Sequence, residues 1–172
     1  DDFDFADADG NNEWWDSGYI FNSDGSAAGT EGGSADINTT TAGRARVQVD
    51  PDATPTRAAY SIKRDEPSYS RYYAVTVDAN VTLNAAQATS TFAGLLISEG
   101  DVGNADNYVL IAREASTTVN RITARAEFNG AVQPTINFST TDNAVAFKIE
   151  RYGNVWNVFY SLTQYPNWQW VK

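Results

Sequence analysis

Alternation of polar and apolar residues with a period of two is the feature that most constrains how this chain can fold. In segment 72–83, every second residue from Tyr73 to Leu83 is apolar, which is typical of a strand that buries one face. Segment 121–128 alternates in the same way, and segments 92–98 and 108–113 are apolar on both faces, as in central strands. No segment shows the sustained 3.6-residue period of an amphipathic helix. The sequence therefore predicts an all-β protein.

Glycine and asparagine separate the predicted strands. Segments 146–151 and 155–161 are predicted to form a hairpin around Tyr152-Gly153-Asn154, and Asn129-Gly130 indicates another tight turn. Shorter strands are predicted at 18–22, 45–49 and 57–64, and segment 22–43 is a long loop or weakly patterned strands. The length of 172 residues and the absence of an internal repeat predict a single domain over 1–172. Many short strands joined by such turns indicate an antiparallel sandwich or barrel.

The net charge of −10 is concentrated at the amino-terminal end of the chain. Residues 1–56 contain twelve acidic residues against Arg44 and Arg46, whereas the remainder contains ten acidic and ten basic residues. This distribution argues against nucleic acid and anionic lipid as partners, because both require a basic surface, and it favours a bound cation. No apolar run reaches the roughly 20 residues of a membrane-spanning helix, so we expect no membrane span.

Three residue types are absent from the sequence: Cys, His and Met. Without Cys there is no disulfide framework, and without His the chain lacks the usual general base and the commonest zinc ligand. Since the sequence has no initiator Met, we expect a processed protein whose signal peptide has been removed. The expected location is therefore secreted or at the cell surface.

Several short motifs occur in an order that is similar to a known superfamily. They are Asp1-Asp2-Phe3, a Trp soon after, segments 92–98 and 107–111, then 147–154, 159–161 and Trp168. In this order they resemble the concanavalin A-like lectin/glucanase superfamily, especially bacterial laminin-G-like, carbohydrate-binding jelly rolls. The resemblance covers nearly the whole chain and implies a two-sheet antiparallel jelly-roll sandwich.

The carboxyl-terminal end departs from that pattern. In such domains two further strands usually follow the last hairpin, but here the sequence stops at Trp170-Val171-Lys172. Three explanations stay open: the sandwich closes differently, an edge is left open for a strand of a neighbouring chain, or the sequence is a fragment.

The acidic amino-terminal segment is the candidate metal site. Segment 5–16 has acids at the third and fifth positions of a calcium loop, but Phe5 occupies the first, so the EF-hand template fails. The resemblance implies a calcium ligand at Asp2, and ligand chemistry adds Asp7, Asp9 and Glu13. The predicted cofactor is therefore calcium, and the alternative is a solvated acidic arm.

A candidate carbohydrate site combines polar and aromatic residues. Arg121, Thr123, Arg125 and Glu127 are predicted to share one face of a strand, with Arg113 joining them. Tyr72 and Trp168 come from two aromatic clusters, and their rings would supply apolar surface to a sugar. The alternatives are that one face of the sheet is simply solvated and that the tryptophans belong to the core.

Catalysis is not expected. The Glu-x-Asp-x-x-Glu motif of the family-16 hydrolases is absent, Glu127 lies alone on its strand, and the Gln-x-His element of the alginate lyases cannot form without His. Two functions then compete. One is a secreted, non-catalytic, calcium-stabilised module for adhesion or carbohydrate binding, whose partner is a glycan or polysaccharide. The other is a self-assembling extracellular subunit of a filament or surface layer, a homo-polymer with strand exchange and calcium between subunits.

Overall fold

The computed structural model describes residues 16–21, 33–37, 45–49, 59–63, 72–82, 91–98, 107–162 and 165–171. The chain divides into two compact units, one formed by Asp1–Ser68 with Asp101–Asn104 and the other by Tyr69–Gly100 with Ala105–Lys172. Within the described ranges every regular element is a β strand, and no helix that could cross a membrane occurs. The all-β prediction is confirmed for this part of the chain, while a single domain over 1–172 stays a prediction.

The first unit contains two antiparallel strand pairs. Strand β1 (Asp16–Phe21) pairs with β4 (Ala59–Lys63), and the register shifts between Ser17 and Tyr19. Strand β2 (Gly33–Ile37) pairs with β3 (Ala45–Val49). Strands β1, β3 and β4 match the predicted segments, and β2 lies inside segment 22–43, for which the sequence predicts either a long loop or weakly patterned strands.

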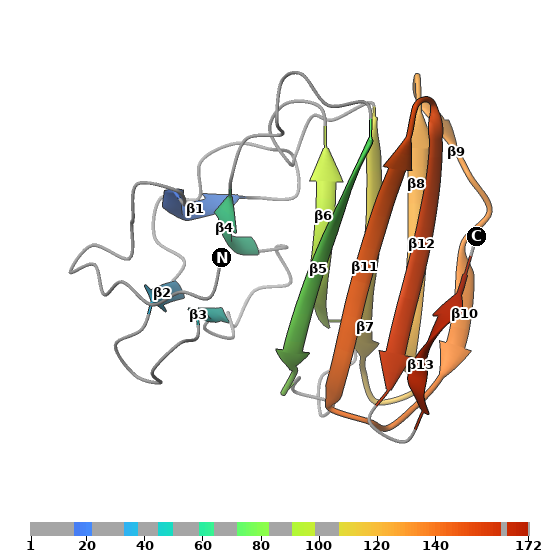
Figure 1. Cartoon of the computed structure of the whole chain (residues 1–172). Coiled ribbons are helices and arrows are strands. Elements are labelled where there is room, and N and C mark those ends of the chain that lie inside the picture. The colour runs from blue at the N-terminus through green and yellow to red at the C-terminus, as the bar shows by residue number, and fades with distance from the viewer. Residues whose placement is uncertain are drawn as a thin grey trace. The chain divides into compact units, whose positions relative to one another are not determined.

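The second unit consists of two antiparallel sheets that lie face to face (Figure 1). The first, called the β8 sheet, has the order β10-β8-β7-β6, and β9 also pairs with β8. Its strands are β6 (Thr91–Ser98), β7 (Tyr108–Ala115), β8 (Asn120–Phe128), β9 (Ala131–Val132) and β10 (Ile136–Ser139). The second, called the β11 sheet, has the order β13-β12-β11-β5. Its strands are β5 (Tyr72–Asn80), β11 (Ala144–Tyr152), β12 (Val155–Leu162) and β13 (Tyr165–Trp170).

Both sheets contribute to one hydrophobic core. Four large side chains are completely buried in it: Ile111 and Ile122 from the β8 sheet, and Phe147 and Ile149 from the β11 sheet. Strand β5 shows how the alternation in sequence leads to this core, because its residues are alternately exposed and half-buried. Burying each of these large apolar side chains contributes about 1.5–3 kcal/mol. The core thus joins the two sheets into a sandwich.

Turns and edges also follow from the local sequence. The β8–β9 turn places Asn129 (φ 51°) and Gly130 (φ 73°) in the left-handed region, as a two-residue hairpin requires. Gly153 (φ 63°) does the same between β11 and β12. The edge formed by β9 and β10 is interrupted around Pro134, because proline cannot donate a ladder hydrogen bond.

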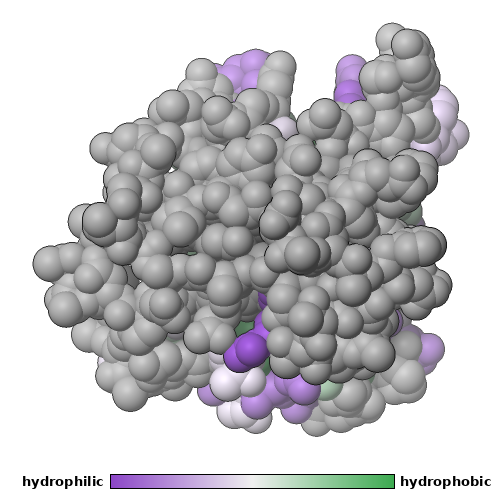
Figure 2. Space-filling view, turned by 90° about the vertical axis from the view of Figure 1, so that its left-hand side faces the viewer, coloured by the Kyte–Doolittle hydropathy of each residue, from purple (hydrophilic) through white to green (hydrophobic). Residues whose placement is uncertain are grey.

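The described residues visible in Figure 2 are mostly hydrophilic.

Candidate functional site

The polar residues of β8 lie on the outer face of the β8 sheet, as the alternation predicted. Arg121 is directly opposite Glu114 of β7, and Arg125 is opposite Leu110. Residues opposite each other in antiparallel strands point to the same face. Since Thr123 and Glu127 are two residues away from the arginines along β8, all four predicted side chains share this face.

Glu114 organises the charges on this face. Its side chain is only 2% exposed, and its two carboxylate oxygens lie 2.7 Å from Arg121 Nε and 3.6 Å from Arg125 Nη2. The Arg125 guanidinium also stacks on Phe92, with its Cζ atom 4.6 Å from the ring centroid. These arginines therefore serve first to neutralise a buried carboxylate, an arrangement that stabilises the sheet because a lone buried charge is costly.

The centre of the outer face of the β8 sheet is closed to solvent. Ala112 and Thr123 lie opposite each other there, and both are completely buried. The Thr123 hydroxyl has no hydrogen-bond partner in the described part of the chain. A buried unpaired hydroxyl costs free energy, and a sugar could not reach it without displacing its neighbours. The Thr123 hydroxyl is therefore not available to a ligand at this face.

Arg113 does not join the other predicted residues. It lies opposite Ile122, so its side chain projects from the inner face of the β8 sheet, and it is 3% exposed. Burial lowers the pKa of the Arg113 guanidinium, and the nearby charge of Asp142 opposes this shift. Segment 108–113 is apolar on both faces in the sequence, so its pattern did not show on which face Arg113 lies. In the structure Arg113 is on the same face as the buried Val109 and Ile111, and not on the face of the polar residues of β8.

The hydrogen bonds of Arg113 explain how a guanidinium is tolerated there. Its Nε donates to the carbonyl oxygen of Asp142 at 2.9 Å, and its Nη2 donates to Asn120 Oδ1. Its Nη1 donates to the carbonyl oxygens of Glu114 at 2.9 Å and Arg121 at 3.1 Å. Arg113 thus ties the end of the β7–β8 hairpin to the segment before β11, which is a structural role.

Tyr72 and Trp168, the aromatic members of the predicted site, lie on the opposite side of the sandwich from β8's polar row. Tyr72 is opposite Tyr152 in the β11 sheet, and both side chains are exposed. Lys148 projects outward between the buried Phe147 and Ile149, and its Nζ lies 5.0 Å from the Trp168 ring centroid. The predicted site therefore does not form one surface.

The outer face of the β11 sheet carries two groups of aromatic rings, together called the aromatic face. In the first, the rings of Tyr72 and Tyr152 lie 4.4 Å apart between centroids at an angle of 60°, and these residues are 59% and 68% exposed. The second contains Phe159, Trp168 and Trp170. Trp170 lies opposite Phe159 and is 64% exposed, and Trp168 is 39% exposed.

Lys148 holds the second group in place. Its Nζ lies 4.2 Å from the Phe159 ring centroid, in addition to its contact with Trp168, and it forms a 2.8 Å ion pair with Glu150. A cation placed over two aromatic rings orients them, and each such contact at an exposed site contributes a favourable interaction free energy of about 0.5–1 kcal/mol. The rings therefore present a defined surface.

A polar row separates the two aromatic groups. Along β11, Tyr152 and Lys148 are four residues apart, which corresponds to about 13 Å. Between them, Glu150 lies opposite Ala74 on one side and Asn157 on the other. Along the strand direction the arrangement is therefore aromatic, polar, aromatic.

The predicted metal ligands Asp2, Asp7, Asp9 and Glu13 all lie outside the described residues. Within the ranges that the structure describes, no three acidic side chains gather into a group that could hold a metal ion. The calcium site thus stays a prediction for the amino-terminal segment.

Comparison with known protein families, curated proteins and solved structures finds no match to this chain. The superfamily resemblance accordingly stays an expectation, and the function rests on the described geometry.

The site prediction missed several residues of the aromatic face, because the sequence alone does not show which strands pair and bring these residues together. Tyr152 was assigned to a turn, whereas β11 continues through it and places it beside Tyr72. Phe159 and Trp170 are brought together by β13, a strand that was not predicted. Alternation within segment 155–161 places Phe159 on the face opposite the buried Val158, and this was the available signal.

Proposed function

We propose that this chain is a secreted, non-catalytic module that binds a glycan along the aromatic face. We also propose that its sandwich is a jelly roll of the concanavalin A-like superfamily, on the basis of the motif order and of the pairing of β5 with β11 across five intervening strands. The observation that carries the functional proposal is the exposure of four aromatic rings in two groups, Tyr72 with Tyr152 and Trp168 with Trp170.

Physical chemistry links this surface to sugars. Exposed apolar surface that is concentrated in one patch marks a binding site, and aromatic rings with a polar handle suit ligands that are apolar on one side and hydroxylated on the other. Glu150, Asn157 and Lys148 offer hydrogen-bonding groups beside the rings. A linear glycan could stack on each aromatic group while its hydroxyls meet the polar row.

Affinity electrophoresis in gels containing soluble β-glucan, xylan, mannan or alginate tests the proposal. The unmodified chain should be retarded by one of them, and Tyr152→Ala and Trp168→Ala should each weaken this retardation about tenfold, the effect of about 1.4 kcal/mol. Val132→Ala is the matched control, because Val132 is an exposed apolar residue of the other sheet. Equal retardation of all variants would contradict the aromatic face as the site.

Calcium is proposed as a stabilising cofactor because the acidic residues of segment 1–56 require neutralisation. A ligand that binds only the native state raises its melting temperature, so a chelator should lower it. The variant with Asp2, Asp7, Asp9 and Glu13 replaced by Asn or Gln should be insensitive to the chelator. An unchanged melting curve of the unmodified chain would count against the site.

A second candidate function is a self-assembling extracellular subunit. It is favoured by β13, an edge strand of the β11 sheet that carries the exposed Trp168 and Trp170, since edge strands pair readily with other chains. Size-exclusion chromatography with and without chelator separates the two functions. A calcium-dependent polymer supports assembly, whereas a calcium-indifferent monomer that binds a polysaccharide gel supports glycan binding.

A further inference from the structure

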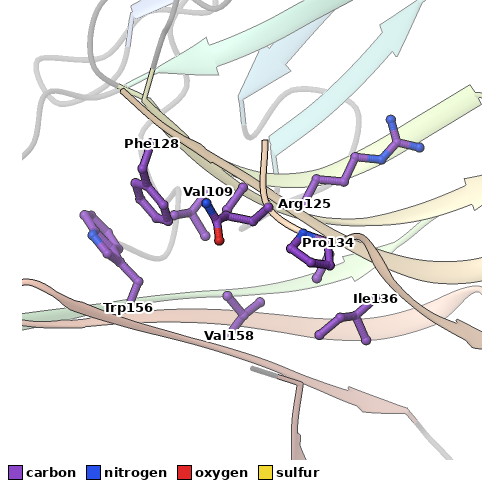
Figure 3. Close-up of a pocket in the computed structure, with 10 residues that line it drawn as sticks. Val109, Arg125, Phe128, Pro134, Ile136, Trp156 and Val158 are labelled. Carbon is purple, nitrogen blue, oxygen red and sulfur yellow. The ribbon is translucent and has the colours of Figure 1, made fainter. Parts of the chain in front are cut away.

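An apolar cavity of about 100 Å³ lies between the two sheets of the sandwich (Figure 3). Its walls include Val109, Ala126, Phe128, Ile136, Trp156 and Val158. Protein interiors are close-packed and rarely contain voids larger than a water molecule. Gln133 and Pro134 add to the lining at the edge strands, but most of the lining is apolar, so the cavity offers space for a hydrocarbon group.

A second, open hollow of about 400 Å³ adjoins this cavity at the end of the sandwich where the β8–β9 and β11–β12 turns lie. Its walls are Asn107, Phe128, Asn129, Arg151, Asn154 and Trp156. Phe128 and Trp156 line both spaces, and their rings lie at one end of the inner cavity (Figure 3). The two spaces together form an apolar interior with a polar mouth between two aromatic rings.

The mouth is held in shape by contacts within the chain. The Asn107 side-chain oxygen accepts a 2.7 Å hydrogen bond from the backbone N–H of Asn129. The Arg151 Nε donates to the carbonyl oxygen of Gly153 at 3.0 Å, and its guanidinium lies 5.0 Å from the Trp156 ring centroid. A site whose side chains are already ordered binds with a smaller entropic cost.

The charges around these spaces favour an anion. Among the described residues, the linings contain Arg125 and Arg151 and no acidic side chain, although the whole chain has a net charge of −10. The Arg125 guanidinium points away from the cavity, toward Phe92 and Glu114. Arg151 is therefore the cation at the mouth, and the three asparagines surround it with amide groups.

We propose that this end of the sandwich binds a short-chain aliphatic carboxylate. The hydrocarbon tail passes between Phe128 and Trp156 into the inner cavity, and the carboxylate lies in the hollow at Arg151. Phe128 and Trp156 line both spaces, so we expect the group that passes between these two rings to be a slender linear tail. This site is separate from the aromatic face, and the inference does not depend on glycan binding.

Calorimetric titration of the full chain at pH 7 with hexanoate tests the inference, with acetate, hexanol and benzoate as comparison ligands. Hexanoate should bind at least about tenfold more tightly than acetate, because buried methylenes contribute about 0.8 kcal/mol each. Hexanol lacks the charge and benzoate lacks the linear tail, so both should bind more weakly than hexanoate. Equal affinity for acetate and hexanoate, or for hexanol and hexanoate, would overturn the proposal, and tighter binding of benzoate would exclude the linear tail.

Two variants and one spectroscopic measurement locate the site. Ala126→Leu fills the cavity and should abolish the preference for hexanoate over acetate, whereas Arg151→Gln should weaken hexanoate binding about tenfold, or about 1.4 kcal/mol. Arg121→Gln, the same change on the outer face of the β8 sheet, is the matched control. Nuclear Overhauser contacts from the hexanoate methyl group to Ile136 and Val158 give a result that does not depend on any variant folding. Contacts to other residues only, or unchanged affinity in Arg151→Gln, would overturn the proposal.

Discussion

The two outer faces of the sandwich have opposite characters. The β8 sheet presents charged side chains, yet its central residues are buried and Glu114 is 2% exposed between two arginines. The β11 sheet presents aromatic side chains, yet Tyr152 and Trp170 are more than half exposed, at 68% and 64%. In the part of the chain that the structure describes, Glu114 is enclosed and paired on one face, while large aromatic rings of the other face are exposed to solvent.

This difference teaches that residue type does not identify the binding face of a two-sheet sandwich. A charged row on a strand is commonly read as a solvated or ligand-binding surface, but here it neutralises one carboxylate. Exposed rings cost free energy in water, and their concentration on one face is the basis of the proposed binding function. The comparison therefore links the outer face of the β8 sheet to stability, and the aromatic face is the one that we propose for recognition.

The largest expected effect on the free energy of unfolding distinguishes Glu114, on the outer face of the β8 sheet, from Glu150 on the aromatic face. Glu114→Ala should lower the free energy of unfolding by about 3 kcal/mol, because it leaves Arg121 and Arg125 without their buried partner. Glu150→Ala, which breaks only the half-exposed pair with Lys148, should cost less than about 0.5 kcal/mol. Urea unfolding measures both values, and similar losses in the two variants would break the comparison.

A smaller effect of opposite sign is expected at Thr123. Replacement by Val, which has nearly the same shape, removes a buried hydroxyl that has no partner in the described part of the chain. The free energy of unfolding should rise by about 1 kcal/mol. Thr76→Val, at an exposed position of β5, is the control and should change it by less than about 0.5 kcal/mol. A loss of stability in Thr123→Val would show that the hydroxyl has a partner.

The smallest effect on stability is expected on the aromatic face itself. Trp170→Ala removes the largest kind of side chain, but because Trp170 is mostly exposed the free energy of unfolding should change by only about 0.5 kcal/mol. Polysaccharide retardation should decrease in the same variant. Thermal unfolding and affinity electrophoresis measure the two quantities, and a large loss of stability with unchanged retardation would assign Trp170 to the fold instead.

Much of the fold could be predicted from local pattern. The alternation in β5 and the apolar runs in β6 and β7 identified strands, and Asn129-Gly130 identified a hairpin. Segments 92–98 and 108–113 were both predicted to be central, but of these two only β7 is central among the described strands, whereas β6 stands at the edge of the β8 sheet. Strands β9, β10 and β13 were not predicted, because they are short or interrupted and are defined by their partners rather than by alternation. The candidate site was predicted only in part: Tyr72 and Trp168 lie on the aromatic face, while the polar residues lie elsewhere.

The sequence by itself determined that the described segments form β strands, because a period of two places apolar residues on one side of each strand. The short turns between those strands indicated antiparallel sheets. It also determined which residues of each strand share a side. Only the tertiary structure decided which side meets the other sheet, that Arg113 is enclosed by carbonyl oxygens, and that rings from β5, β11, β12 and β13 lie on one face. The physical reason is that pairing between distant strands depends on the packing of the whole core, which no local pattern specifies.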